Sequence, residues 1–231
     1  MSRPEMFSPE HFAELRAILV PATIDTLYMV AYSSFFAIII GTAIGITLYI
    51  TSNSLLCSRT PITGALNSIL ALIVNIGRSI PFVILIIAVA PVTRIIVGTF
   101  IGTQAAAVSL TIAAIPFVAR LTESTFAGLD KGVIEASISC GASLSQTIRK
   151  VLIPETLPGL ILNYTVAIVN LIAFSAMAGV IGGGGLGDVA IRRGLQHFRT
   201  DMLVGTIIIL VIIVQIVQFI GDILARLVDK R

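Results

Sequence analysis

Residues 207–214 read IIILVIIV and lie inside a stretch of 20 residues, from 202 to 221, that carries no charged side chain. A β-strand that crosses a membrane alternates apolar and polar residues, whereas this run is apolar at every position. An α-helix rises about 1.5 Å per residue, so about 20 apolar residues cross the hydrocarbon core. The stretch therefore predicts a transmembrane helix and argues against a β-barrel.

The composition extends this prediction to the whole chain. Of the 231 residues, 56% are hydrophobic and 12% are charged, and the mean hydropathy is +1.03. Soluble domains carry about 25% charged residues, so the surface of this chain cannot face water over most of its area. The net charge of +3 is too small to indicate a nucleic-acid partner. We therefore expect an all-α membrane protein with several spans.

Uncharged stretches of 20 to 33 residues predict four of the spans. Arg78 divides the segment between Arg59 and Arg94 into uncharged pieces of 18 and 15 residues, and neither is a convincing span alone. We therefore expect the second span to be one helix that contains Arg78. A charge inside the membrane usually faces protein or water, and Pro81 would free backbone carbonyls to bind it. The alternative is that Arg78 snorkels to the membrane surface. The five expected spans are 22–50, 66–91, 103–121, 158–181 and 203–226.

The loops suggest an orientation. Cytoplasmic loops carry an excess of lysine and arginine. With the N-terminus outside and the C-terminus in the cytoplasm, the inner segments hold 8 such residues and the outer segments hold 6. The inner segments then include the longest polar loop, 122–157.

This loop is expected to contain two short helices. Asp130 can cap a helix that starts at Lys131, with Ile134, Ile138 and Gly141 along one face, and Gly141 can end it. Ser143 and Gln146 form the capping box of a second helix, which we expect to stop before Pro154. Periodicity leaves open whether the pair lies on lipid headgroups or docks into a cytoplasmic partner.

The same loop carries a sequence signature. Glu135-Ala136-Ser137, then Gly141, then Ile153-Pro154, resembles the EAA signature of ABC importer permeases. The chain departs from that pattern at Ser137, where alanine is usual, and matches its I-x-L-P ending only loosely. Neither difference adds bulk that would prevent this loop from docking into a cytoplasmic partner.

Other segments resemble the methionine-uptake ABC permeases, and the similarity covers nearly the whole chain from about residue 20. They are residues 75–82 (NIGRSIPF), 101–106 (IGTQAA), 174–179 (FSAMAG), 182–188 (GGGGLGD) and 218–222 (QFIGD).

The resemblance implies the architecture and the partners. It implies one permease domain over 1–231, with the five-span fold of an ABC type I importer permease, in the bacterial inner membrane. It implies a homodimer joined to two copies of an ATPase subunit and supplied with D- or L-methionine by an extracytoplasmic binding protein. ATP and magnesium would be bound by the ATPase, so this chain would hold no cofactor, no metal and no catalytic residue.

The resemblance also assigns roles to residues. The coupling residues that would contact the ATPase are Glu135, Ala136, Ser137, Gly141, Ile153 and Pro154. Met177 becomes a candidate gate, because two flexible thioethers meeting on a dimer axis could close an apolar pathway, and Ser175 and Asn170 could offer polar contacts. Independently of the resemblance, Arg78 with Pro81 is expected to form a structural bridge inside the membrane, at a subunit or span interface.

Glycines mark three further features. Gly41-x-x-x-Gly45 and Gly98-x-x-x-Gly102 are typical of closely packed helices, although the second pair could lie in a loop. Gly182-x-Gly184-x-x-Gly187 has the letters of a dinucleotide fingerprint, but it follows an apolar span rather than a strand. We expect it to be a flexible exit from the fourth span that bends as a gate opens.

Three rival functions remain. An ion-coupled secondary transporter usually needs carboxylates inside the membrane, and residues 26–122 contain no acidic side chain. A membrane-embedded enzyme lacks support, because the sequence shows no nucleophile set, no metal cluster and no phosphate-binding G-x-x-x-x-G-K-[ST] motif. A permease for another amino acid or small ligand is the rival that the sequence excludes least well.

Overall fold

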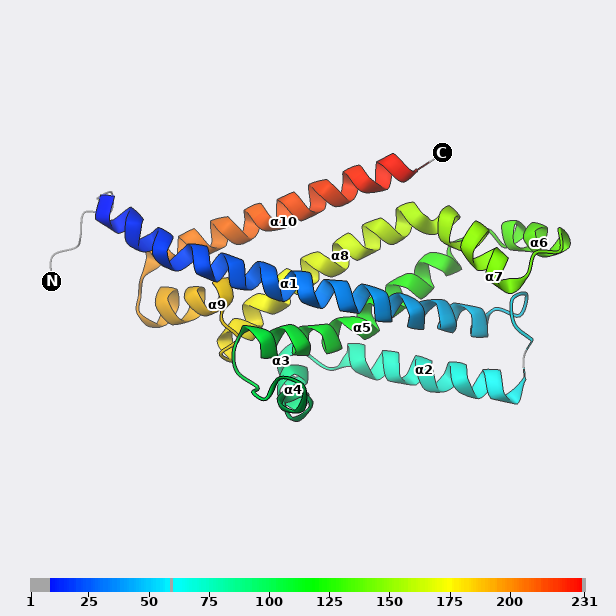
Figure 1. Ribbon diagram of the computed structural model, residues 1–231, viewed down its shortest axis with the longest axis horizontal. Helices are drawn as coiled ribbons and strands as arrows, with labels where there is room; N and C mark the ends of the chain where they lie inside the picture. Colours follow the sequence, from blue (N-terminus) through cyan, green and yellow to red (C-terminus); the bar gives the residue numbers. More distant parts are fainter. Residues whose placement is uncertain (1–8, 59, 230–231) are drawn as a thin grey trace. The chain divides into compact units, whose positions relative to one another are not determined.

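The computed structural model describes residues 9–58 and 60–229, and every regular element in these ranges is a helix (Figure 1). Arg3, Arg59, Lys230 and Arg231, which the charge count used, lie outside them. Two of the elements, η1 and η2, are π-helical. The elements are α1 (Pro9–Ser52), α2 (Pro61–Ser79), α3 (Phe82–Ala88), α4 (Ala90–Val97), α5 (Thr103–Ala127), α6 (Lys131–Ser139), α7 (Leu144–Thr147), η1 (Ile148–Leu152), α8 (Ile153–Val180), α9 (Gly185–Asp188), η2 (Val189–Gln196) and α10 (Thr200–Val228).

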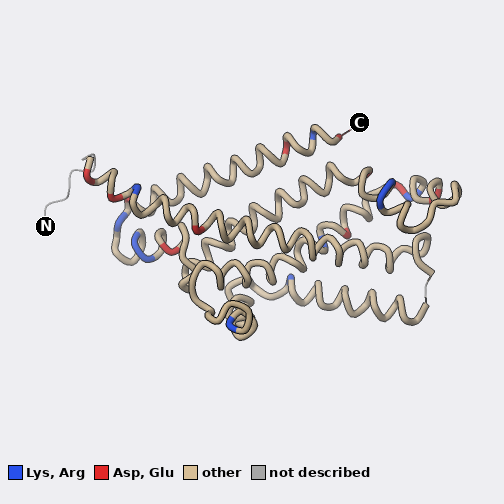
Figure 2. Tube along the Cα trace, viewed as in Figure 1, with Lys and Arg blue, Asp and Glu red and all other residues tan. Residues whose placement is uncertain are grey.

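Five helical stretches of the described chain are long and apolar enough to cross a membrane, which confirms the predicted number. They are α1, α2, α5, the continuous run Leu144–Val180, and α10. Figure 2 shows that long parts of α1, α8 and α10 carry no charged residue.

The second span is shorter than predicted, and the single helix expected over 66–91 is wrong. Thr60 caps α2 in a capping box with Thr63, and the helix ends at Ser79. Ile80 is extended, with φ −83° and ψ 125°, as a residue before proline tends to be. Pro81 therefore separates α2 from α3 instead of loosening one helix, and Arg78 lies exposed in the last turn of α2.

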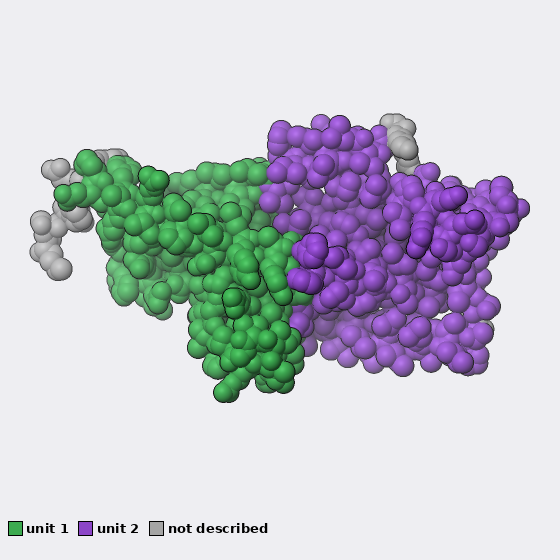
Figure 3. Space-filling model, viewed as in Figure 1, with its two compact units in different colours: residues 1–34, 82–111, 169–216 green, residues 35–81, 112–168, 217–231 purple. Residues whose placement is uncertain are grey.

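The chain forms two compact units, coloured in Figure 3. One unit comprises residues 1–34, 82–111 and 169–216, and the other comprises 35–81, 112–168 and 217–231. We call them the first and the second unit. Four helices, α1, α5, α8 and α10, contribute residues to both.

The core of the first unit joins α1 to the segment that precedes α10. Leu19 and Ala22 of α1 are buried with Leu186 of α9, Val189 of η2 and Met202 of α10. The Thr26 hydroxyl also accepts a hydrogen bond from the backbone N–H of Leu186 at 2.9 Å. The α9–η2 segment is therefore anchored to α1 by apolar and polar contacts.

The second unit has a core at the ends of its long helices. Tyr49 of α1, Phe126 of α5 and Leu160 of α8 are buried together with Ile134 and Leu152. A neighbouring cluster joins Leu48, Val74 and Ala119. These contacts fix α2 and α5 against α1.

The two glycine pairs behave differently. A Cβ at Gly41 would lie 2.7 Å from Cβ of Val118, and one at Gly45 would lie 2.5 Å from the carbonyl oxygen of Ala119. This close packing of α1 on α5 confirms the prediction for the first pair. The prediction is wrong for Gly98 and Gly102, which have positive φ and no atoms within 4 Å of a Cβ. Gly98 ends α4 in the left-handed conformation, as the loop alternative allowed.

We predict that Gly45→Ala destabilises the protein. The added methyl group meets the backbone of α5, which cannot move as a flexible side chain could, and overpacking of this kind costs about 1–3 kcal/mol. The thermal unfolding midpoint of the purified protein in detergent measures the effect.

Gly64→Ala is the matched control, because Gly64 lies in α2 with no atoms within 4 Å of its Cβ position. Alanine is the better helix former by about 1 kcal/mol, so this variant should match or exceed the parent in stability. A Gly45→Ala protein as stable as Gly64→Ala would contradict the close packing of α1 on α5.

Candidate functional site

The loop that carries the EAA-like signature, residues 128–154, begins with the capped helix that the sequence predicts. Asp130 has an extended backbone, and its Oδ1 accepts a hydrogen bond from the N–H of Gly132 at 2.8 Å. The carboxylate satisfies one of the free N–H groups at the start of α6 and favours the positive end of the helix dipole. This cap fixes where Glu135 lies on the helix.

A tight turn joins α6 to α7. The N–H of Gly141 donates to the carbonyl of Ile138 at 2.9 Å, and Gly141 adopts φ +77° with open space around it. The Ser143 N–H then donates to Oε1 of Gln146 at 2.8 Å, while Ser143 Oγ accepts from the Gln146 N–H. Both the end of α6 near Gly141 and the capping box are as predicted.

Ser137 contributes a contact that the sequence does not reveal. Its hydroxyl lies 3.1 Å from the hydroxyl of Thr147, which is buried. The bond joins α6 to α7 across the turn. The departure from the EAA pattern at Ser137 therefore has a structural use, since alanine could not make this bond.

The loop is anchored to the long helices through two aliphatic residues. Ile134 of α6 and Leu152 of η1 are completely buried, against Tyr49, Phe126 and Leu160. Of the face predicted for α6, only Ile134 is buried, whereas Ile138 and Gly141 are exposed. The burial of Leu152 was not predicted. Leu152 directly precedes Ile153, one of the predicted coupling residues, which is half-buried against the same core.

The second loop helix does not stop before Pro154, so that prediction is wrong. The chain continues from α7 through η1 into α8 without a break. In η1 the N–H of Ile153 bonds to the carbonyl of Ile148, five residues back. Pro154 lies in the first turn of α8, and the widened turn before it accommodates a residue with no N–H to donate.

The exposed surface of the loop gathers most of the predicted coupling residues. Glu135, Ala136, Gly141 and Pro154 are exposed, and Arg149 and Lys150 are exposed farther along. Exposed charges on a loop that a buried core holds in place are suited to bind a protein surface of complementary charge. In the described part of the chain, no three histidine, cysteine, aspartate or glutamate side chains are placed to share a metal ion.

The predicted pathway residues lie in α8, within the first unit. The Met177 side chain is 45% exposed, whereas Ser175 is buried and donates its hydroxyl proton to the carbonyl of Ile172 at 2.7 Å. Asn170 is half-buried and lies about one and a half helical turns before Ser175. Met177 and Ser175 therefore lie on different faces of the helix.

The glycines at the end of α8 and directly after it make close contacts rather than a loose exit. A Cβ at Gly179 would meet Cα of Gly187 at 3.0 Å, and one at Gly187 would meet the backbone of Ala176. Gly182, Gly184 and Gly185 all have positive φ. These residues turn α8 into α9 tightly beside Met177, and the described chain has no strand there to form a dinucleotide-binding unit.

Comparisons with known proteins agree with this geometry. The family model described as binding-protein-dependent transport system inner membrane component matches residues 54–231. The probable D-methionine transport system permease protein MetI of Vibrio cholerae is 49% identical over 95% of this chain and 96% of its own length. The methionine import system permease protein MetP of Bacillus subtilis is 46% identical over 91% and 93%.

A solved structure gives the same answer for the fold. A chain of the MetNI methionine ABC transporter, described in inward-facing conformations, matches over 100% of both chains with a TM-score of 0.86 and 40% identity. The likeness confirms the expected five-span fold of an ABC importer permease. The chain therefore belongs to the family of binding-protein-dependent transport system inner membrane components.

Proposed function

We propose that this chain is the membrane-spanning subunit of an ATP-driven importer of methionine. The observation that carries the proposal is the likeness to the MetNI chain over the full length of both proteins. Relatives named for D-methionine and methionine transport support the same substrate. Because the names include D-methionine, we propose that both enantiomers are carried.

The α6–α7 loop is the proposed contact with an ATPase subunit, one copy for each of two permease chains. Glu135, Ala136, Ser137, Gly141, Ile153 and Pro154 are the proposed coupling residues. ATP and magnesium bind to the ATPase in this proposal, and this chain performs no covalent chemistry. Support comes from the exposed Glu135 and Gly141 on a loop whose other face is fixed in the core by Ile134.

We propose a multi-pass orientation in the inner membrane with the N-terminus outside and the C-terminus in the cytoplasm. The α6–α7 loop is then cytoplasmic, where an ATPase has access to ATP. The turn after α8 lies on the outer side, where an extracytoplasmic methionine-binding protein would deliver substrate. The excess of basic residues in the inner segments supports this assignment.

The gate is proposed to form from two copies of Met177 in a homodimer. An exposed methionine among small residues leaves an apolar side chain for a second copy to cover. Asn170 would offer a polar contact, and Ser175 would contribute through its bond to Ile172, which shapes this part of α8. Arg78 at the exposed end of α2, followed by Pro81, is proposed to bridge to another span or subunit.

Two alternatives lead to different experimental results. A permease for another amino acid or small ligand would bind an ATPase but would not move methionine. An ion-coupled secondary transporter would need no ATPase and would respond to an ion gradient.

We predict that Gly141→Trp and Glu135→Lys reduce capture of the ATPase subunit by about tenfold or more. The indole ring of the first variant would fill the space into which the ATPase docks. We propose that the Glu135 carboxylate pairs with a basic group of the ATPase, so the ammonium group of the second variant would meet a like charge, at a cost of several kcal/mol. Co-purification with the ATPase and ATP-dependent methionine uptake into proteoliposomes measure both effects.

Gly98→Trp is the matched control for Gly141→Trp. Gly98 also has a positive φ, +83° against +77°, and open space around its Cβ position. Both variants carry the same backbone strain, so only the loop variant should lose the ATPase. Equal loss of ATPase capture in both variants would contradict the proposed coupling surface. Capture of the ATPase without methionine uptake would agree with an ABC permease but would overturn methionine as the substrate.

We predict that Met177→Ala makes the transporter leak. Removing the thioether opens the proposed apolar closure, so methionine should cross reconstituted membranes without ATP. Flux of labelled methionine in proteoliposomes without ATP measures the leak. Val180→Ala is the control, because Val180 is also exposed near the end of α8; equal flux through both variants would argue against a gate at Met177.

A further inference from the structure

An arginine-lined hollow lies in the first unit, in the segment between α9 and α10. Its volume is about 520 Å³, and its lining consists of Arg192, Arg193, His197 and Arg199. None of these residues is acidic. The N–H donors of the lining suit an anion, and Arg193 supplies the uncompensated charge, because Arg192 pairs with Asp188 and Arg199 pairs with Glu14 and Asp201.

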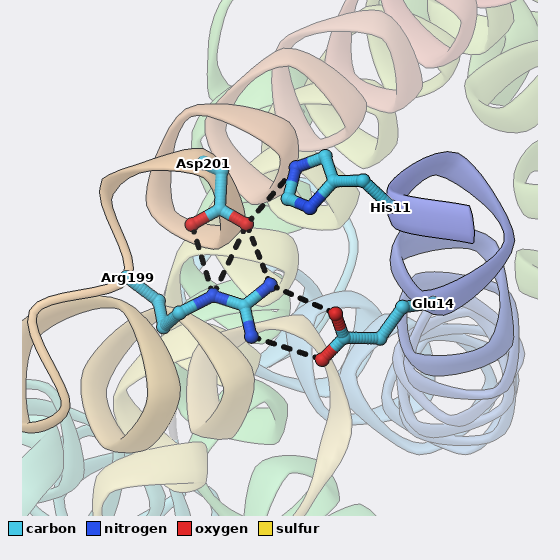
Figure 4. Close-up of polar contacts among 4 residues, drawn as sticks. All are labelled: His11, Glu14, Arg199 and Asp201. Atoms are coloured by element: carbon cyan, nitrogen blue, oxygen red, sulfur yellow. Dashed lines mark hydrogen bonds and ion pairs between the residues drawn. The ribbon is translucent and has the colours of Figure 1, made fainter. Parts of the chain in front are cut away.

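Arg199 links this segment to α1. Its guanidinium donates to both carboxylate oxygens of Asp201, with the shortest bond at 2.7 Å, and to both oxygens of Glu14 (Figure 4). His11 approaches the same Asp201 carboxylate at 3.4 Å. The hydrogen bonds to Asp201 and then Glu14 raise the pKa of Arg199 above its ordinary value. Arg199 is therefore permanently charged, and its N–H donors are engaged by Asp201 and Glu14.

Two other arginines keep donors available. Arg192 makes one bond, from Nη2 to Asp188 at 2.7 Å, and its side chain remains 62% exposed. Since a guanidinium has five N–H donors, most of them stay free. Arg193 is exposed and has no ion pair with any described residue. The backbone carbonyl of Arg193 accepts a hydrogen bond from the N–H of Arg199 at 3.2 Å. This bond turns the chain back and places Arg193 beside Arg199.

Large apolar side chains lie beside these arginines. Leu195 is 61% exposed and Phe198 is 88% exposed. Phe198 also adopts φ +56°, a conformation that bulky residues rarely adopt. Phe198 precedes the first residue of the last span by only two positions. Phenylalanine and leucine beside arginine are typical of segments that lie in the membrane interface, with the apolar side chains toward the acyl chains and the basic ones toward the headgroups.

We propose that this segment binds the phosphodiester of an acidic phospholipid headgroup. Arg192 and Arg193 donate charge-assisted hydrogen bonds to the phosphate oxygens, and His197 also lines the hollow. Arginine suits phosphate because its planar fork donates two parallel bonds. Leu195 and Phe198 enter the boundary between headgroups and acyl chains. In the proposed orientation, this segment belongs to a connection on the outer side of the membrane.

A lipid fits these observations better than an acidic protein does. A short basic segment with large apolar residues, placed directly before a span, has the character of an interfacial anchor. An acidic protein surface would need the arginines but not the highly exposed, apolar ring of Phe198. The proposal does not depend on which substrate is transported.

The test is binding of short-chain phosphatidylglycerol to the assembled transporter purified in detergent. We expect saturable binding by native mass spectrometry, and weak binding of the matched phosphatidylcholine. Arg193→Gln should raise the Kd about tenfold, the effect of losing roughly one charge-assisted bond. Phe198→Ala should raise the Kd of the lipid while leaving the Kd of the isolated headgroup, glycerophosphoglycerol, unchanged.

Arg94→Gln is the matched control. Arg94 is an exposed arginine in α4, in a connection between spans on the same side of the membrane. Its Kd should stay within about twofold of the parent. An equal effect of both arginine variants would overturn the proposal, as would an unchanged Kd in a stable Arg193→Gln protein. Displacement of the lipid by equimolar inorganic phosphate would assign the site to the free anion. Displacement by polyglutamate but not by glycerophosphoglycerol would assign it to an acidic protein.

Discussion

The burial of Ile134 and Leu152 against Tyr49, Phe126 and Leu160 is the contact on which the rest of the candidate site depends. Two helices this short would not be stable alone, because helix formation in water has a costly nucleus. Each aliphatic side chain gains roughly 1.5–3 kcal/mol by leaving water, and Ile134 and Leu152 do so in the same core as α1, α5 and α8. The capping bonds of Asp130 and Ser143 then decide where each helix begins, while the core decides which face is turned outward.

The prediction of the fold from sequence succeeded where one local cause dominates. A long uncharged stretch has few alternatives to a membrane helix, so the number of spans was recovered. Caps are equally local, because Asp130 needs only the N–H groups two or three residues away. The two proline predictions failed for a different reason. Pro81 ends α2, whereas Pro154 is accepted into a continuous helix by the π-helical turn before it, and no pattern around either proline distinguishes these outcomes.

The parts of the site that sequence could not supply involve pairs distant along the chain or unusual turns. The hydroxyl contact between Ser137 and Thr147 needs the turn at Gly141 to bring the two helices together. The Glu14 and Arg199 pair spans 185 positions, and nothing in either neighbourhood indicates the other. The glycine pairs show the same limit, since identical spacing gave close packing at Gly41 and Gly45 but a loop at Gly98 and Gly102. Spacing indicates what is permitted, and only the surrounding fold decides whether a second helix is present.

In the proposed importer, the continuity of α8 determines how the coupling loop can influence the gate. The run from Leu144 to Val180 passes from α7 through η1 to Met177 without a non-helical residue. An α-helix is stiff along its axis, and its compliance is concentrated at π-turns and prolines. In this helix those features, η1 and Pro158, both lie near the loop. A displacement of the loop would therefore first bend α8 near the loop. Within the first unit, the close packing of Gly179 on Gly187 ties the end of α8 that carries Met177 to the α9 turn, so the α9 turn would have to move with Met177.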